Sequence, residues 1–522
     1  MVTRARLRRS FAAAPVLGAA LLVASCAPVA TPGRTSLAWV VGQEEPRFDP
    51  TGPADPARWA LERLLGEGLV AEDSTGQIVP AAAEGWELAP DSLTCTFHLR
   101  PGLRFADGRR CTAADFGGAL RAGLNRVDHA TYAWLLAAVT GVERVRAGRP
   151  LPPVGIEAPD DRTLVLRLTR ADPSLLRALA LPGASMPWRA DDPGGGWGGG
   201  IGPYRLVARE PGRRMVLVRR VPGGGADTVR VEFVLGTPAV RVRLRAGRAD
   251  LIWPLPPGLL GQRLPGEYRL RTRYARPPRR LWLVMRADLP PTTKVEARRA
   301  LAHGLNRAEL MSVLADHGAR TGEWVPGGGS FEFPRQDMSL IREALDRGHL
   351  GRSLHVVMAY RSDGIAAELA TSLQTEWAGE GLDMELRPLR GAALAAAVLG
   401  RGGAQLLLTD AQAPLGDPAT ELAMLAAPRR GPPVGTFRTG WSTPEFDRAL
   451  ARRPTDPPLD VAYAERRLEQ ELVALPLLRL PWLWVERAGG HWTGSHPRFG
   501  PDPGTLVDAP PPPRAAAGLE GH

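Results

Sequence analysis

Apolar and polar residues alternate along residues 93–99, which is the period-two pattern of a strand with one buried face. Two turn signals follow this strand, Pro101-Gly102 and Asp107-Gly108. The segment Thr112-Ala-Ala-Asp115 then has the form of a capping box, which predicts the start of a helix. The apolar positions of that helix are Phe116, Leu120 and Leu124. Residues 76–116 are therefore predicted to form a compact hairpin-like unit that runs into a helix.

The hydrophobic pattern predicts further strands and helices that alternate along the chain. Predicted strands cover residues 36–41, 163–168, 204–208, 354–359 and 405–408. Predicted helices cover residues 58–69 and 365–377, and a capping box at residues 306–309 separates two more. Pro444 lies where the first turn of another helix is expected. This alternation indicates an α/β architecture, and we find no internal repeat.

Length and charge limit the class of protein. The chain has 522 residues, enough for two or three domains, and its 44% hydrophobic and 23% charged residues are typical of a soluble globular protein. The net charge is +11, and it falls to +7 without residues 1–25, which hold four Arg and no acidic residue. The nearest basic run, residues 269–280, holds six Arg but is interrupted by two prolines. We therefore interpret it as solvated surface and not as a nucleic-acid interface.

The N-terminus has the features of an export signal. Four arginines precede the apolar stretch of residues 11–23, which is too short to span a membrane. The sequence Val23-Ala-Ser-Cys26 resembles a bacterial lipobox, and cleavage before Cys26 would leave a lipid-modified cysteine at the N-terminus. The alternative is an ordinary secretory signal that is cleaved near Ala24 or Ala27. Because no other segment offers roughly 18 uninterrupted apolar residues, we expect the mature chain to be exported and tethered.

Three other features have more than one interpretation. Cys95 and Cys111 are expected to be either buried free thiols or one disulfide in an oxidising compartment. We expect no metal site, because the chain has no CxxC or HExxH motif and its nine His are scattered. The glycine run at residues 194–204 could be a phosphate-binding loop, but no Lys-Ser/Thr follows it. We interpret it as the entry to a strand.

The unit at residues 76–116 resembles the core of the family 5 extracytoplasmic solute-binding proteins, the dipeptide and oligopeptide receptors of ABC importers. The matching residues are Pro80, Ala83, Glu84, Trp86, Thr96, Phe97, Leu99, Arg100, Phe105, Asp107, Gly108, Thr112, Ala113 and Asp115. Further segments resemble the family in the same order along the chain: residues 200–204, 245–250, 295–310, 441–447 and 474–484. The resemblance thus covers roughly residues 36–490.

This resemblance implies an α/β, two-lobed periplasmic-binding-protein fold of type II, in the large peptide-binding class, with two interlobe crossovers. The expected order is a lipoprotein signal peptide (1–25), a tether (26–35), lobe I (36–271, with a subdomain at about 70–185), lobe II (272–479), a return to lobe I (480–508) and a disordered tail (509–522). The crossovers are expected near residues 272 and 480.

The resemblance also points to residues that would bind the ligand. Peptide receptors of this family bind the ligand amine with an Asp in a D-x-x-D/E-P turn. Here Asp410 follows an apolar strand and Asp417-Pro418 matches the end of that turn, but the two Asp are seven positions apart where three are usual. Either the loop has a four-residue insertion, or the amine contact is rebuilt or absent. The alternative without a ligand-binding role is that Asp410 only ends a strand and Asp417 lies in a turn.

Arg361 and the loop at Gly42 and Gln43 complete the expected ligand contacts. Arg361 lies between a strand and a helix, near the position from which dipeptide receptors hold the ligand carboxylate, and its guanidinium suits that task. Gly42 and Gln43 follow the first strand and align with a cleft-lining loop of lobe I. An arginine in such a loop is more often only solvated. The assignments of Arg361 and of the loop at Gly42 and Gln43 as ligand contacts are therefore hypotheses.

By this resemblance we expect a substrate-binding lipoprotein and not an enzyme. It would capture a short peptide or similar small solute between its lobes and deliver it to an ABC permease and ATPase complex. It would act as a monomer on the periplasmic or cell-surface side, without a cofactor. One alternative is a transport-uncoupled sensor or interaction lipoprotein on the same scaffold. An extracytoplasmic hydrolase is disfavoured, because the chain has no GxSxG elbow, zincin motif or persuasive catalytic pair.

Overall fold

The computed structural model describes the chain between residues 35 and 502. Within that span it leaves out residues 44, 47, 49–54, 125–134, 143–154, 189–195, 222–224, 261, 315–319, 322–332, 363, 399, 414, 417, 426–436, 447–460, 489–494 and 497. The predicted signal peptide, the lipidation site Cys26, the ligand candidate Asp417 and the predicted tail at 509–522 lie outside the described residues. Those predictions therefore stay predictions.

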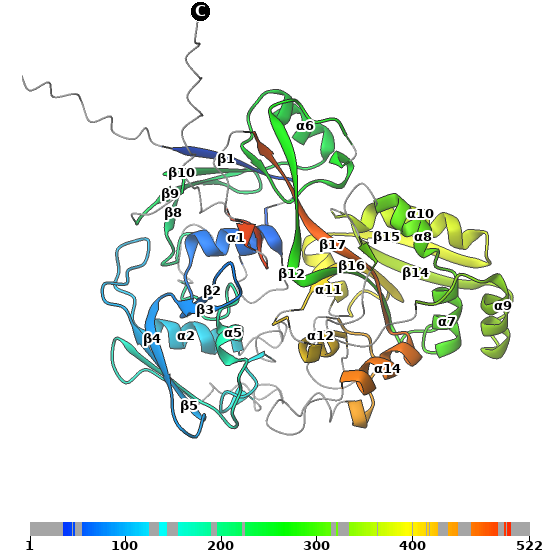
Figure 1. Ribbon diagram of the computed structural model, residues 1–522, viewed down its shortest axis with the longest axis horizontal. Coiled ribbons are helices and arrows are strands. Elements are labelled where there is room, and N and C mark those ends of the chain that lie inside the picture. Colours follow the sequence, from blue (N-terminus) through cyan, green and yellow to red (C-terminus); the bar gives the residue numbers. More distant parts are fainter. Residues whose placement is uncertain are drawn as a thin grey trace, which may run out of the picture.

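One large mixed sheet runs through the molecule (Figure 1). Its strands lie in the order β15-β14-β16-β12-β17-β11-β1-β10-β9-β8, and β13 pairs with β17. The bounds are β1 Ser36–Val41, β8 Tyr204–Glu210, β9 Arg214–Arg219, β10 Thr228–Phe233, β11 Leu251–Ile252, β12 Tyr268–Met285, β13 Arg320–Thr321, β14 Leu354–Arg361, β15 Leu382–Leu389, β16 Leu406–Gln412 and β17 Ala474–Arg487.

In the part of the chain that the structure describes, three smaller sheets and the helices accompany the large sheet. A four-stranded sheet has the order β4 (Ala83–Leu88), β5 (Thr94–Leu99), β7 (Thr163–Arg167) and β6 (Ile156–Glu157), and the pairs are β2 (Val70–Glu72) with β3 (Ile78–Pro80) and β18 (Ser495–His496) with β19 (Gly500–Pro501). The helices are α1 Pro56–Leu65, α2 Ala113–Leu124, α5 Leu175–Leu179, α6 Thr237–Arg245, η1 Pro257–Leu259, α7 Val295–His303, α8 Arg307–Leu314, α9 Met338–Arg347, α10 Ala366–Ala378, α11 Gly391–Val398, α12 Pro418–Leu425 and α14 Val461–Glu471. The predicted α/β class is confirmed.

The unit predicted at residues 76–116 is present. β4 and β5 form an antiparallel hairpin in which Trp86 faces Phe97, and alternate residues of β5 are buried. Its helix, α2, begins where the capping box predicts, because the Asp115 carboxylate accepts hydrogen bonds from the Thr112 backbone N–H at 2.8 Å and from its hydroxyl at 3.0 Å. Local sequence pattern and local hydrogen bonding therefore agree here.

Two long strands connect the two halves of the large sheet. β12 and β17 pair in antiparallel fashion almost throughout, with a register shift between Tyr274 and Arg279. We call the part around β1, β8–β11 and the four-stranded sheet lobe I, and the part around β14–β16 with α7–α14 lobe II. The strands β12 and β17 thus lie where the sequence places the two crossovers, while the residue bounds of the lobes remain a prediction.

Each lobe has its own apolar core. In lobe I, α1 packs below the sheet with Leu61, Leu64 and Leu65 buried, and a separate cluster fills the space around β5 and α2. In lobe II, α10 packs on β14 and β15, with Leu369, Leu373 and Trp377 fully buried, as their four-residue spacing predicts. The prediction for α1 was too long at its C-terminal end, because the chain leaves the helix at Gly66.

The glycine run before β8 has a packing role. Ideal Cβ atoms at Gly200 and Gly202 would lie 2.1 Å from the carbonyl oxygen and 2.4 Å from the carbonyl carbon of Leu65. The absence of side chains lets this segment pass against the C-terminal end of α1. The described part of the run leads into β8, as the strand-entry interpretation predicts.

The two described cysteines are free thiols. Cys95 on β5 and Cys111 before α2 are both buried in the lobe I core and form no disulfide. Burial raises the pKa of Cys95 to about 11 and that of Cys111 to about 12. Of the two interpretations left open by the sequence, the structure therefore has the buried thiols, protonated at neutral pH.

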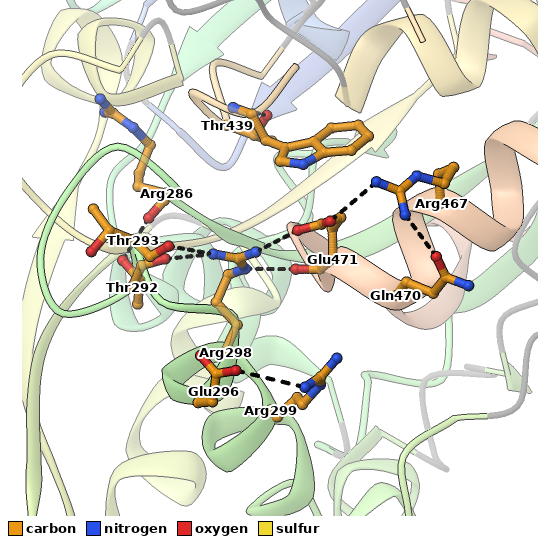
Figure 2. Close-up of polar contacts among 11 residues, drawn as sticks. Arg286, Thr292, Thr293, Glu296, Arg298, Arg299, Thr439, Arg467, Gln470 and Glu471 are labelled. Atoms are coloured by element: carbon orange, nitrogen blue, oxygen red, sulfur yellow. Dashed lines mark hydrogen bonds and ion pairs between the residues drawn. The ribbon is translucent and has the colours of Figure 1, made fainter. Parts of the chain in front are cut away.

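A buried arginine holds the first helix of lobe II in place (Figure 2). The Arg298 guanidinium in α7 donates to the Glu471 backbone oxygen at 2.6 Å, to the Thr292 carbonyl at 2.7 Å and to the Glu471 carboxylate at 3.0 Å. It thereby joins α7, the turn before it and the end of α14. Arg298 lies in the segment at residues 295–310 that resembles the family. This arginine of the segment therefore has a structural role.

Candidate functional site

The two charged residues that the sequence singles out in lobe II lie side by side. Arg361 ends β14 and Asp410 lies near the end of β16, and these strands are parallel neighbours, with Met358 opposite Leu406. Because the carboxyl ends of neighbouring parallel strands meet at one edge of a sheet, the two side chains approach each other. The Arg361 Nη1 and Asp410 Oδ1 atoms are 4.0 Å apart.

Asp410 has a closer partner on the crossover strand. Arg279 of β12 donates from Nε to Asp410 Oδ2 at 2.7 Å, and its guanidinium also lies 4.8 Å from the centre of the Trp482 ring. The Asp410 side chain is only 5% exposed. Its second oxygen, Oδ1, has no hydrogen-bond donor among the described residues. One oxygen of this carboxylate is therefore held by the protein, and the other keeps acceptor capacity.

The charge state of Asp410 follows from these neighbours. Burial alone would raise the pKa of its carboxyl group, but the positive charges of Arg279 and Arg361 and the hydrogen bond from Arg279 outweigh burial. The pKa of Asp410 is consequently below its ordinary value. The site thus holds a buried carboxylate that is ionised at neutral pH.

Arg361 also reaches across to lobe I. Its Nη2 atom lies 3.8 Å from Asp55 Oδ2, and the Arg361 side chain is 12% exposed. Asp55 is the N-cap of α1, where its carboxylate accepts a hydrogen bond from the Arg58 backbone N–H at 2.8 Å. Opposite charges from the two lobes therefore meet at Arg361.

Gln43 and Gly42 approach the same place from β1. The Gln43 side chain is buried and donates from Nε2 to both Asp55 oxygens, at 3.1 and 3.3 Å. The Gly42 N–H donates to the Pro254 carbonyl at 3.0 Å, and an ideal Cβ at Gly42 would lie 2.6 Å from that oxygen. A ligand contact by the Gly42 N–H would have to replace this bond. The proposed ligand contacts of both residues stay predictions.

The structure thus brings four of the five predicted ligand residues together, and it adds two that sequence reasoning missed. The missed residues are Asp55 and Arg279. Asp55-Pro56 has the form of a helix start, which gives a local reason for the aspartate. Arg279 belongs to the basic run at 269–280, and its interpretation as solvated surface was wrong at this end. Arg279 is 18% exposed, and Arg280 is 2% exposed and paired with Glu421.

The chemistry of this arrangement suits a charged ligand. Asp55, Arg361, Asp410 and Arg279 form a row of alternating charge from lobe I to the crossover strand, and the neutral Gln43 donates to Asp55 at one end of it. A ligand ammonium group could bind the available oxygen of Asp410, and a carboxylate could bind Arg361 in place of Asp55. Two hollows in the described part of the chain, of about 10 and 340 Å³, lie elsewhere.

Neither a metal site nor a membrane span emerges from the described residues. No group of three or more His, Cys, Asp or Glu side chains among them could hold a metal ion. The helices that the structure describes are all too short or too polar to cross a membrane.

Known proteins resemble this chain in sequence. The periplasmic oligopeptide-binding protein OppA of Haemophilus influenzae is 36% identical over 135 residues, which are 25% of this chain and 25% of that protein. The match thus spans about a quarter of the length of the first curated relatives. The oligopeptide-binding protein OppA of Bacillus subtilis is 23% identical over 470 residues, which are 81% of this chain and 83% of that protein.

Solved structures share the fold. The structure of H. influenzae OppA in complex with the peptide RPPGFSPFR superposes with a TM-score of 0.74 at 21% identity, over 91% of this chain and 98% of that chain. This similarity confirms the predicted two-lobed periplasmic-binding-protein fold. The model of the bacterial extracellular solute-binding proteins, family 5, matches residues 77–432. That match covers more than half of the sequence, and the chain therefore belongs to this family of solute-binding proteins, whose members are binding proteins and not enzymes.

Proposed function

We propose that this chain is the substrate-binding lipoprotein of an ABC importer. It captures a short peptide, or a similar small zwitterion, between its lobes and delivers it to the permease. The proposal is supported by family membership and by relatives that are named for oligopeptide binding. The observation that carries it is the row of charges at the ends of β14 and β16, which faces Asp55 of lobe I.

The physical argument concerns the burial of charge. A zwitterionic peptide that leaves water needs both of its charges paired, because an unpaired buried charge costs several kcal/mol. Asp410 Oδ1 has no donor among the described residues and offers an acceptor for the peptide ammonium group. Arg361 offers a guanidinium whose contact with Asp55 is long, at 3.8 Å. The peptide carboxylate would take the place of Asp55.

Native mass spectrometry of the purified mature protein with a pool of di- to pentapeptides tests this function. We expect retained peptides, and we expect Asp410→Asn to abolish retention. The matched control is Asp383→Asn, since Asp383 is an exposed aspartate on β15 that pairs with His355. Absence of any retained peptide at high micromolar concentration would contradict the peptide assignment.

One observation favours a second candidate, a transport-uncoupled sensor or interaction lipoprotein on the same scaffold. Asp410 already has Arg279 at 2.7 Å and Arg361 at 4.0 Å, so the protein itself balances the charge that a ligand amine would meet. Growth on a peptide as the sole source of a required amino acid separates the two functions. An importer loses this growth on deletion of the gene, whereas a sensor does not.

The lipid anchor at Cys26 is tested by itself. We expect Cys26→Ser to release the protein from the membrane fraction, because the acyl chains supply the membrane affinity. Unchanged membrane association of this variant would contradict the lipoprotein assignment and leave the ligand-binding proposal intact.

A further inference from the structure

Leu415 is a lobe II residue that is buried in the core of lobe I. It lies between β16, which ends at Gln412, and α12, which begins at Pro418, and its side chain is fully buried. It belongs to the apolar cluster around β5, α2 and α5, whose other buried members all lie between Leu69 and Ile201. Among the described residues of this cluster, Leu415 is thus the one side chain that comes from the second lobe.

The backbone around Leu415 is held on both sides. Towards lobe I, Arg177 of α5 donates to the Leu415 carbonyl at 3.4 Å. Towards the crossover strand, the Gln412 side chain donates to the Pro277 carbonyl at 2.6 Å. Gly416 has φ of +76° and an ideal Cβ there would lie 3.0 Å from the Pro277 ring, so glycine lets the loop turn closely over β12.

The position of this loop ties it to the candidate site. Asp410 lies in β16, five residues before Leu415, and Arg279, its partner, is two residues after Pro277, against which Gly416 packs. If the lobes separate about β12 and β17, Leu415 must leave the lobe I cluster and its apolar surface must enter water. Burial of that surface favours the closed arrangement.

We propose that Leu415 is a positioning residue that couples the segment after Asp410 to closure of the lobes, and that it holds the lobes together even without a ligand. The inference rests on the proposed function only in that closure is the means of capture. The Arg361–Asp55 contact acts across the same gap, but it is electrostatic and long, at 3.8 Å, and added salt weakens such a contact at least in part. An apolar anchor is not weakened in that way.

The distance between spin labels on the two lobes of the ligand-free protein tests this. Labels at Glu87→Cys on β4 and Arg347→Cys at the end of α9 replace exposed side chains, in a chain that also carries Cys26→Ser. Cys95 and Cys111 are buried and stay unlabelled. We expect one closed distance population for the parent protein, and this population should persist in 1 M salt.

Leu415→Ala should raise the ratio of open to closed molecules by about tenfold or more, as loss of much of a leucine's buried surface predicts. Leu415→Met should restore the closed population. The matched control is Leu422→Ala, which truncates an equally buried leucine of α12 within a lobe II cluster.

Three outcomes would overturn the proposal: an open parent protein, an unchanged distance in Leu415→Ala, or an equal shift in Leu422→Ala. Because no ligand is present, the result is independent of whether peptides bind. A failed peptide assay with a normal Leu415 result would reject the ligand and keep the anchor.

Discussion

Arg279 and Asp410 are joined by a 2.7 Å hydrogen-bonded ion pair between neighbouring antiparallel strands, at the point where the crossover strand meets lobe II. The Arg279 side chain is 18% exposed and that of Asp410 is 5% exposed. Water therefore screens this pair little, and the two charges depend on each other.

The first prediction concerns the loss of that carboxylate. Asp410→Asn leaves Arg279 and Arg361 without their shared counter-charge, and we expect the free energy of unfolding to fall by about 3 kcal/mol. Urea denaturation at pH 7 measures the change. The control Asp383→Asn, at an exposed pair with His355, should change stability by no more than about 0.5 kcal/mol.

The pH dependence of this difference has a definite sign. Because the folded protein lowers the pKa of Asp410, the stabilisation is present above the unfolded-state pKa and disappears as pH falls through the folded value. The difference in the free energy of unfolding between the parent protein and Asp410→Asn should therefore become smaller only in acid, below about pH 4. A difference that stays constant down to the lowest pH would show that the charge of Asp410 contributes nothing to stability.

Local patterns predicted much of the fold, and the resemblance to the solute-binding family predicted part of the site. The alternation at 93–99 corresponds to β5, whose alternate residues are buried, and the Thr112–Asp115 box corresponds to the start of α2, where the capping contact joins residues three positions apart. Asp410 and Arg361 were singled out by the resemblance to the family and by their positions after predicted strands, and the structure brings them together because β14 and β16 are parallel neighbours.

The parts that sequence reasoning missed depend on long-range pairing. Arg279 meets Asp410 131 positions away, and Arg177 meets Leu415 238 positions away. An arginine in a basic run has the same local pattern whether it is solvated or paired with a distant carboxylate. Only the course of β12 beside β16 decides between these environments.

A second prediction concerns His496. Burial and the nearby charge of Arg63 lower its pKa from 6.5 to about 4. Its Nε2 lies 3.0 Å from the Glu72 carbonyl, and its Nδ1 accepts from the Arg498 backbone N–H at 3.1 Å, which together fit the neutral ring with its proton on Nε2.

The folded state thus resists protonation of His496 while the unfolded state does not. Above pH 6.5 this group should leave the free energy of unfolding unchanged. Between pH 6.5 and about 4 the free energy of unfolding should fall by at most about 3 kcal/mol because of His496. Urea denaturation across this range measures the loss. His496→Gln keeps a donor for Glu72 but cannot titrate, so its stability should fall less steeply over the same interval. Equal slopes of stability against pH for the parent protein and His496→Gln would show that His496 does not cause the loss.

A third prediction uses neighbouring arginines with opposite environments (Figure 2). Arg298→Ala removes a guanidinium that is 2% exposed. It takes this donor from the Thr292 and Glu471 carbonyls and from the Glu471 carboxylate, which keeps its contact with Arg467 at 3.4 Å, so we expect a loss of about 3 kcal/mol in urea denaturation. Arg299→Ala removes a side chain that is 42% exposed and 3.9 Å from Glu296, and it should cost less than about 0.5 kcal/mol. Similar losses for both variants would contradict the structural role of Arg298.

The last prediction compares glycines before β8 and in α2. In Gly202→Ala the new Cβ would lie 2.4 Å from the Leu65 carbonyl carbon, and backbone cannot yield as a flexible side chain can. We expect a loss of about 2 kcal/mol, within the range for overpacked sites. Gly118→Ala adds a methyl group at an exposed position of α2 with no atom within 4 Å, and it should raise stability by about 0.5–1 kcal/mol because alanine favours the helix. Thermal unfolding of the two variants should therefore move in opposite directions. A stabilised Gly202→Ala would mean that the segment before β8 does not pack tightly against the end of α1.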